Sequence, residues 1–286
     1  MTGPLFQLLL GGLVFAVAEM ALTHRLARRW NNYGIVDVVW SAGFAALAVG
    51  GLGWCAWRFH DAKLAGWPSW NLPAAGTMTG LVVLWSLRLA GHLFVRVKAH
   101  HPVEDVRYAQ LRAEWGPGTA RRMFWFFQLQ GALQCLLALP FFVVLLNLER
   151  PGPWAGLRPV EWLGVVLCLA GLAGESVADR QLARFRANPA HRGRVCQEGL
   201  WNWSRHPNYF FEWLVWVGFA VFALGSPLGW LGLLSPALMW HFLNHVTGIP
   251  MTEALSVKSR GDAYRAYQRT TSPFFPWFKR APGAGP

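Results

Sequence analysis

Seven apolar runs constrain this chain more than any other feature. A helix needs about 20 apolar residues to cross the roughly 30 Å hydrocarbon core of a bilayer, and helices satisfy their own backbone hydrogen bonds in lipid. The runs cover residues 4–22, 35–57, 76–95, 124–147, 159–177, 209–224 and 228–246. Only Gly225-Ser226-Pro227 separates the last two, so a tight helical hairpin is expected there. The sequence predicts an all-α, polytopic protein with seven transmembrane helices, forming a single integral-membrane domain.

The basic residues predict the orientation of the spans. The chain has 286 residues, of which only 14% are charged, yet its formal net charge is +12. Of 26 Lys and Arg, 21 lie on one side of the predicted spans, Arg88 lies inside the third span, and four lie on the other side: Arg58, Lys63, Arg150 and Arg158. By the positive-inside rule the N-terminus is outside and the C-terminus is cytoplasmic.

The composition also indicates which classes of binding partner to expect. A nucleic-acid binder of this basicity would have a more polar sequence, so we expect no nucleic acid and attribute most of the charge to contact with anionic membrane lipid. The four cysteines, Cys55, Cys135, Cys168 and Cys196, lack the spacing of metal ligands and are interpreted as small apolar residues, so no metal is expected. Motifs of soluble nucleotide-binding domains are absent from the sequence.

Polar side chains gather at the inner ends of the predicted spans. Such groups are costly in lipid and usually functional, which favours a shared pocket open to the cytoplasm; the alternative is that each is an interfacial residue reaching for water. Several lie four residues apart and are expected to share a helical face, as in Tyr33/Asp37, Arg88/His92, Glu175/Asp179, Asn208/Glu212 and His241/His245. The others are Glu19, Gln128, Gln130, Gln134, Tyr209 and Asn244.

The inner loop after the fifth run is rich in arginine. Arg184, Arg186 and Arg194 are among six basic residues between Arg180 and Arg205. Arginine suits bidentate recognition of phosphate, while attraction to lipid headgroups explains the same pattern without a ligand. A phosphate-bearing ligand would need only two or three of them.

The most specific stretch is Gly199-Leu200-Trp201-Asn202-Trp203-Ser204-Arg205-His206-Pro207-Asn208-Tyr209-Phe210-Phe211-Glu212. It resembles the signature of the steroid 5α-reductase-like family, in its bacterial branch of the DUF1295 type. The resemblance continues in Gly261-Asp262-Ala263-Tyr264-Arg265-Ala266-Tyr267-Gln268 and Pro273-Phe274-Phe275-Pro276-Trp277. It also includes Ile35-Val36-Asp37-Val38-Val39-Trp40, Trp85-Ser86-Leu87-Arg88-Leu89 and Phe127-Gln128-Leu129-Gln130-Gly131. It therefore covers nearly the whole chain.

The resemblance implies a bacterial inner-membrane reductase with its active site facing the cytoplasm. Such an enzyme binds NADPH and reduces an enone carbon–carbon double bond, as in 3-oxo-4-ene steroids. A steroid-like or isoprenoid enone would enter from the bilayer, and we expect a monomer. The residues assigned to the cofactor are Arg88, Gln130, Glu175, Asp179, Arg186, Arg205, His206, Asn208, Tyr209, Glu212, Asn244 and His245.

The resemblance also places the catalytic groups. Asp37 matches the region where steroid reductases hold a catalytic acid, and it is one carbon shorter than their glutamate. Trp85 falls where those enzymes have a tyrosine proton donor, so Tyr33 and His92 are considered as donors in its place.

Two other hypotheses remain open from the sequence. A membrane methyltransferase of the isoprenylcysteine carboxyl methyltransferase type shares an Arg-His-Pro-x-Tyr motif and uses S-adenosylmethionine, but it has paired glutamates where this chain has a single Glu253. A lipid-binding or transport protein would use the polar inner half as a binding site or ion path. No inverted repeat or broken helix pair of the transporter kind is evident, which counts against transport.

Overall fold

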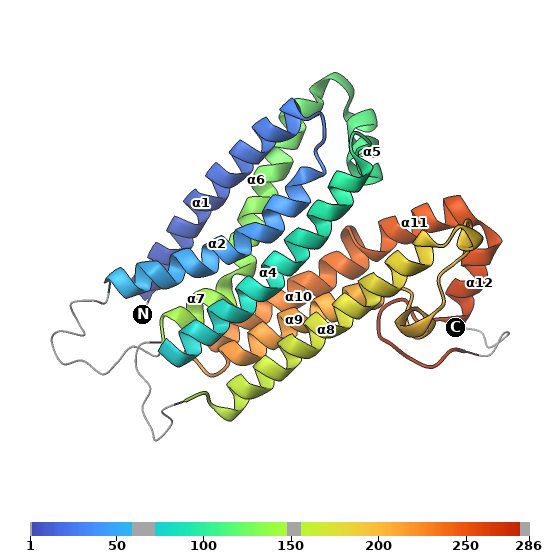
Figure 1. Ribbon diagram of the computed structural model, residues 1–286. Helices are drawn as coiled ribbons and strands as arrows, with labels where there is room; N and C mark the ends of the chain where they lie inside the picture. The colour runs from blue at the N-terminus through green and yellow to red at the C-terminus, as the bar shows by residue number, and fades with distance from the viewer. Residues whose placement is uncertain (1, 59–71, 148–155, 281–286) are drawn as a thin grey trace. The chain divides into compact units, whose positions relative to one another are not determined.

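The computed structural model describes residues 2–58, 72–147 and 156–280 (Figure 1). Within these ranges every regular element is a helix, and Ser204 and Ser272 add an isolated parallel bridge. The all-α prediction is therefore confirmed for this part of the chain. Lys63 and Arg150, two of the four basic residues on the predicted outer side, lie outside the described residues.

Two compact units make up the chain. Unit 1 consists of Met1–Glu161 and Phe222–Gly232, and unit 2 consists of Trp162–Val221 and Leu233–Pro286. Both units contain candidate transmembrane helices. The expectation of a single integral-membrane domain stays a prediction.

Four helices are long and apolar enough to cross a membrane. They are α1 (Thr2–Arg29), α2 (Ile35–Arg58), α4 (Leu72–His100) and α8 (Pro159–Ala187), and they contain the first, second, third and fifth predicted runs. Many of their large apolar side chains are exposed, for example Phe6 and Val14 on α1. Water-facing helices seldom carry such a surface, whereas lipid-facing helices require it.

The fourth predicted run is a bent pair of helices. The pair joins residues Val106–Leu137 to α7 (Leu139–Leu145) with a bend of 41°, and it counts as a fifth candidate span if both parts cross together. Pro140 lies in the first turn of α7, where its ring is tolerated, but it cannot continue the hydrogen bonds of α6 (Thr119–Leu137). The bend follows from this proline.

Unit 1 is a bundle of packed helices. α2 packs most extensively on α4, and α1 packs on α6, so the four helices run side by side (Figure 1). α5 (Val106–Trp115) precedes α6 and is capped by Asp105, whose side chain accepts a hydrogen bond from the backbone N–H of Arg107. The turn between α1 and α2 contains Asn31 at φ 50° and Tyr33, so Tyr33 precedes the helix. The expectation that it shares a helical face with Asp37 is wrong for this reason.

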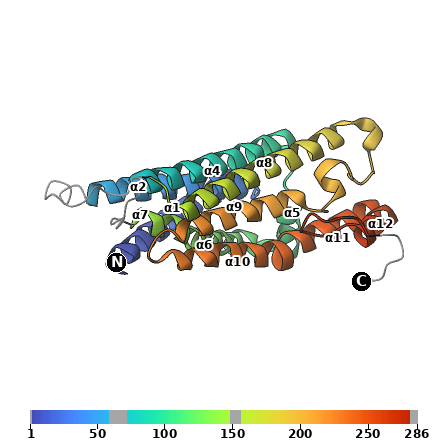
Figure 2. The same cartoon turned by 90° about the horizontal axis from the view of Figure 1, so that it is seen from below.

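Unit 2 begins with the rest of α8 and is completed by four further helices, shown from below in Figure 2. These are α9 (Pro207–Ala223), α10 (Leu234–His241), α11 (Ile249–Arg260) and α12 (Asp262–Thr270). Gly261 joins α11 to α12 at φ 53°, a backbone conformation that favours glycine.

The sixth and seventh predicted runs form shorter elements than expected. α9 has 17 residues, and the run 228–246 divides into a 3₁₀ turn (η4, Gly229–Leu233), α10 and a π-helical turn (η5, Phe242–Val246). The Gly225-Ser226 turn that follows α9 belongs to unit 1 and is hydrogen-bonded to other residues of that unit. There, Arg158 Nη1 and Asn147 Nδ2 donate hydrogen bonds to the Gly225 carbonyl over 2.6 and 3.5 Å.

Candidate functional site

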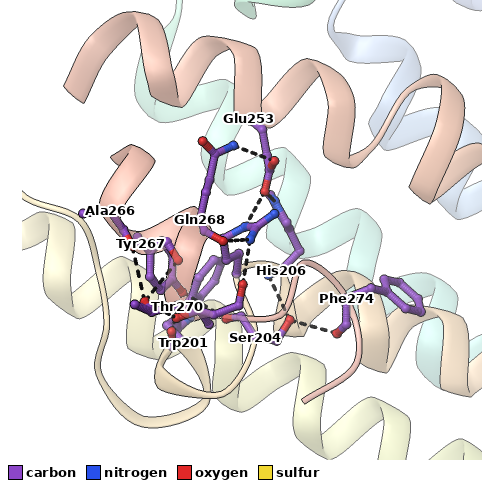
Figure 3. Close-up of polar contacts among 11 residues, drawn as sticks. Trp201, Ser204, His206, Glu253, Ala266, Tyr267, Gln268, Thr270 and Phe274 are labelled. Atoms are coloured by element: carbon purple, nitrogen blue, oxygen red, sulfur yellow. Dashed lines mark hydrogen bonds and ion pairs between the residues drawn. The ribbon is translucent and has the colours of Figure 1, made fainter. Parts of the chain in front are cut away.

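A buried polar cluster in unit 2 joins three segments that are distant in the sequence. Arg205 and His206 lie in the short segment before α9, Glu253 lies on α11, and Gln268 lies on α12. We call these four residues the Arg205 cluster, of which Figure 3 labels His206, Glu253 and Gln268. The segment before α9 is kept non-helical because Pro207 begins the helix, and a residue preceding proline disfavours helical geometry.

Glu253 is the centre of this cluster. Its Oε1 accepts hydrogen bonds from Arg205 Nε over 2.6 Å and from His206 Nε2 over 3.3 Å, and its Oε2 accepts one from Gln268 Nε2 over 2.8 Å. Arg205 also donates from Nη1 to the carbonyls of Gln268 and Thr271, over 2.8 and 2.6 Å. A buried charge pair with this many hydrogen bonds is well compensated for its loss of water.

The C-terminal segment closes the cluster on one side. The backbone N–H of Arg205 donates to the Ser272 carbonyl over 2.9 Å. The Ser204 hydroxyl donates to the Phe274 carbonyl over 2.8 Å (Figure 3). The Tyr267 hydroxyl donates to the carbonyls of Trp201 and Ser204. Hydrogen bonds therefore join the segment around Arg205 to residues 267–274.

The ionisation of the cluster follows from its contacts. Burial acts to raise the pKa of Glu253, but the hydrogen bonds from His206, Arg205 and Gln268, together with the Arg205 charge, outweigh it and lower this pKa to about 2. Burial lowers the pKa of His206, and the hydrogen bond and charge of Glu253 offset this only in part. At neutral pH the cluster therefore holds one cation, one anion and a neutral imidazole that donates from Nε2.

These shifts predict a loss of stability on acidification. His206 is more readily protonated in the unfolded chain than in the folded protein, so its contribution is complete above pH 6.5 and falls as the pH drops below that value. The contribution of Glu253 is complete above pH 4.5 and is lost as the pH falls toward about 2. Thermal unfolding followed between pH 8 and 5 is expected to show a falling midpoint.

Two variants test whether His206 causes the slope of this pH dependence. His206→Gln is expected to flatten the slope below pH 6.5, by up to about 1.4 kcal/mol per pH unit for one proton. His245→Gln, which changes an exposed histidine of the same unit, is expected to leave the slope unchanged. Equal slopes in His206→Gln and the parent protein would contradict this assignment.

A second polar cluster, in unit 1, surrounds Asp37 at the start of α2. Arg107 Nη2 donates to Asp37 Oδ2 and the Tyr108 hydroxyl donates to Asp37 Oδ1, both over 2.6 Å. Tyr108 is buried, and Arg107 also donates from Nε to Asp105 Oδ1 over 2.9 Å. Both oxygens of the predicted catalytic acid therefore accept hydrogen bonds from α5.

Tyr33 has different partners. Its backbone N–H donates to Glu104 Oε1 over 2.6 Å, and the Arg112 guanidinium lies 4.8 Å from the centre of its ring. Arg112 in turn binds both carboxylate oxygens of Glu104 over 3.0 Å. Tyr33 and Asp37 are thus both tied to the α5 region, but through separate contacts.

The other predicted site residues have varied surroundings. In unit 1, Arg88 is half-buried and His92 is exposed on α4, and the Gln130 carbonyl accepts a hydrogen bond from the Trp40 indole over 3.0 Å. In unit 2, Glu175 is buried, Asp179 is half-buried and Arg186 is exposed on α8.

The remaining predicted residues lie on α9 and η5. The Tyr209 hydroxyl lies 3.1 Å from Thr252 Oγ1, and its ring stacks on His206. Glu212 accepts a hydrogen bond from the Trp216 indole over 3.1 Å. The half-buried Asn244 donates to the Trp240 carbonyl over 2.9 Å, and His245 is exposed.

Sequence reasoning missed several members of both clusters. Arg107 counts only among the 21 basic residues on one side of the predicted spans, Tyr108 is given no role, and Glu253 is considered only as a difference from the methyltransferases. Gln268 was quoted in the resemblance without a role. A signal was present for α5, because Asp105 is a good N-cap residue placed directly before the helix.

The fold and both clusters define the class of protein: a multi-pass membrane protein, helical in the described residues, with partly buried ionic clusters. The chain belongs to the family described as "Protein of unknown function (DUF1295)", which matches residues 23–271. It is 28% identical over 225 residues to an uncharacterized protein of Schizosaccharomyces pombe, C594.04c. That match covers 70% of this chain but only 62% of the yeast protein. No solved structure matches the chain.

Proposed function

We propose that this protein is a membrane-embedded, NADPH-dependent reductase of an enone double bond in a hydrophobic substrate, with steroid 5α-reductase-like chemistry. One observation carries the proposal: the segment most specific to that resemblance, residues 199–212, meets residues 261–268, where the resemblance continues, in the Arg205 cluster. The family also includes steroid 5α-reductase-like proteins. The proposal places the protein in a bacterial inner membrane.

The proposed topology has seven spans, with the N-terminus outside and the C-terminus cytoplasmic. α9 contributes the sixth span and the run from η4 to η5 the seventh. The 17 residues of α9 extend about 25 Å at 1.5 Å per residue, which is short for a span. Short spans are accommodated by local thinning of the bilayer or by flanking polar residues that reach the interface.

The residues of unit 2 suit a dinucleotide. Asn208 Oδ1 is buried and accepts no hydrogen bond from any described residue, so it can accept one from a ligand. Exposed arginines at the end of α8 and in the following loop, among them Arg184, Arg186 and Arg194, suit phosphate oxygens. When bound, the cofactor supplies the hydride; the chain's residues bind and orient it.

For the carbonyl end of the substrate, the proposal keeps Asp37 and adds Tyr108. Polarising a carbonyl oxygen requires a hydrogen-bond donor. The single proton of the Tyr108 hydroxyl is donated to Asp37 in this structure, so Tyr108 polarises the substrate only when this hydroxyl turns from Asp37 to the carbonyl oxygen. Arg107 then remains the partner of Asp37, while Tyr33 and His92 remain the alternative donors.

The experiment that tests the function identifies the bound nucleotide. The protein is purified in mild detergent, and the small molecules released on denaturation are identified by mass spectrometry. NADP(H) would support the reductase, and S-adenosylmethionine would support the methyltransferase hypothesis instead. Retention of neither, with no thermal shift on adding either, would contradict both enzyme hypotheses and leave lipid binding or transport.

Asn208→Ala is expected to weaken NADPH binding roughly tenfold, because one buried hydrogen bond of about 1–1.5 kcal/mol is lost. Titration of the full chain with NADPH, followed by its fluorescence, measures this change. Asn202→Ala removes the same side chain six residues earlier and serves as the matched control, with no expected change in affinity. Equal affinities in the two variants would remove Asn208 from the cofactor site.

A further inference from the structure

The chain end of unit 2 carries a group of exposed aromatic side chains. We call residues 271–280 the C-terminal arm. Trp277 and Phe278 are 68% and 70% exposed, and Phe275 is 50% exposed. Trp203 joins them, since its ring centroid lies 5.1 Å from that of Phe278. Trp203, Phe278 and Trp277 form a chain of ring contacts, and a group of large exposed rings of this kind indicates an interaction site.

The backbone of the arm is held in place. Beyond the hydrogen bond from Arg205 to Ser272, the N–H of Trp277 donates to the Trp203 carbonyl and the N–H of Arg280 donates to the Thr270 carbonyl, both over 2.9 Å. These bonds fasten the arm at its beginning, middle and end. The exposure of its rings is therefore imposed by the fold.

The arm lies against the beginning of α9. The Phe275 ring centroid is 5.8 Å from that of Phe210 and 5.9 Å from that of Trp213, and both partners lie in the first two turns of the helix. In the seven-span arrangement proposed above, α9 enters the membrane at this end. Trp and other aromatic side chains favour the membrane–water interface, so the arm lies at the depth where such rings are stable.

An open cavity with basic lining residues lies next to Phe278 along the chain, since Lys279 and Arg280 line it. Its volume is about 410 Å³, and its lining residues are Gln197, Ala266, Tyr267, Thr270, Lys279 and Arg280. Lys279 Nζ donates to Gln197 Oε1 over 2.8 Å, which directs this ammonium toward the lining. Two cationic and two hydroxyl side chains, without a carboxylate among the lining residues, match the oxygens of a phosphodiester.

We propose that the C-terminal arm is a binding site for an anionic phospholipid of the cytoplasmic leaflet. Lys279 and Arg280 bind the phosphodiester in the cavity, and Trp277 and Phe278 lie among the glycerol and upper acyl groups. Charge complementarity favours this occupant, because residues 258–280 contain six basic side chains and one acidic one, Asp262, which pairs with Arg265. The site is independent of the proposed reductase chemistry.

The first test measures lipid binding by the full chain. The protein in detergent is titrated with phosphatidylglycerol, and bound lipid is counted by native mass spectrometry. Phosphatidylglycerol is expected to bind more tightly than phosphatidylcholine. Lys279→Gln combined with Arg280→Gln is expected to weaken the first binding event roughly fivefold for each charge removed.

The matched control is Lys258→Gln combined with Arg269→Gln. It removes the same two charges from exposed positions of α11 and α12 that do not line the cavity, so the affinity should be unchanged. Equal losses in both double variants would show diffuse charge attraction and overturn the proposal. Displacement of the lipid by millimolar inorganic phosphate would also overturn it, because the site would then recognise a free anion.

The second test locates the arm in a bilayer. The four native cysteines are buried, so a thiol-reactive fluorophore on Phe278→Cys is selective in the folded protein. In nanodiscs containing phosphatidylglycerol, lipids brominated near the headgroup are expected to quench this fluorophore, and the cavity variant should reduce the quenching. Absence of quenching in any lipid would place the arm in water and overturn the proposal, whatever nucleotide the protein retains.

Discussion

Glu253→Gln is expected to lower the free energy of unfolding by about 3 kcal/mol, because it leaves the charge of the buried Arg205 uncompensated. Arg205 is only 9% exposed, so water cannot replace the lost carboxylate. The glutamine keeps the shape of the side chain and offers one acceptor, yet its amide group is also a donor. Glu253 Oε1 and Oε2 both accept hydrogen bonds, so one of the three donors, on Arg205, His206 or Gln268, must rearrange.

The buried cysteines provide the measurement. Cys55, Cys135, Cys168 and Cys196 become reactive when the chain unfolds, so a thiol-reactive dye reports the thermal midpoint in detergent. We expect a fall of roughly 6 °C or more in Glu253→Gln. Glu198→Gln is the matched control, because it makes the same change at an exposed position of the same unit. A similar midpoint in both variants would show that the Arg205–Glu253 pair contributes little to stability.

Gly218→Ala is expected to destabilise unit 2 by about 1–3 kcal/mol through overpacking between α8 and α9. A methyl group at this position would lie 2.6 Å from the Cys168 nitrogen and 2.9 Å from the Gly164 oxygen, and both atoms belong to the backbone of α8. A side chain can relieve a close contact by changing its rotamer, but the backbone of a packed helix cannot. Gly171 faces α9 in the same way, with its added carbon 2.8 Å from the Phe211 oxygen.

Gly80→Ala is the control for the glycine prediction. Gly80 is an exposed helix residue of α4, and nothing lies within 4 Å of an added methyl group. The same change there should leave the thermal midpoint unchanged or raise it, because alanine is the better helix former. An unchanged or raised thermal midpoint in Gly218→Ala would contradict the close approach of α8 and α9. Gly171→Ala is expected to follow Gly218→Ala.

The helices of this protein could largely be predicted from the sequence. The runs 35–57 and 76–95 lie inside α2 and α4, because a long apolar segment leaves the backbone no alternative to internal hydrogen bonds. The break inside the fourth run is explained by Pro140. The structure of the run 228–246 was harder to predict. It divides into η4, α10 and η5, and the type of helix changes without a change in hydropathy.

The candidate site was predicted only in part. Arg205, His206 and Asp37 were selected from their positions, but their partners were not, since Glu253 lies 48 residues from Arg205 and Arg107 lies 70 residues from Asp37. Hydrophobic periodicity reports which face of a helix is buried and carries no information about which helix lies opposite. Tyr33 was misplaced because a turn residue four positions before Asp37 has the spacing of a helical neighbour.

By itself the sequence determines that the described part of the chain is helical and that its long helices are apolar enough to cross a membrane, because run length, hydropathy and proline act locally along the backbone. Only the tertiary structure decided that Arg205 is neutralised by Glu253, that Asp37 binds Tyr108, and that the aromatic C-terminal arm lies along the start of α9. Each of these depends on burial and hydrogen bonding between segments that meet only after the helices pack. The strength of an ionic or polar contact is set by the partners and the dielectric of that packed interior.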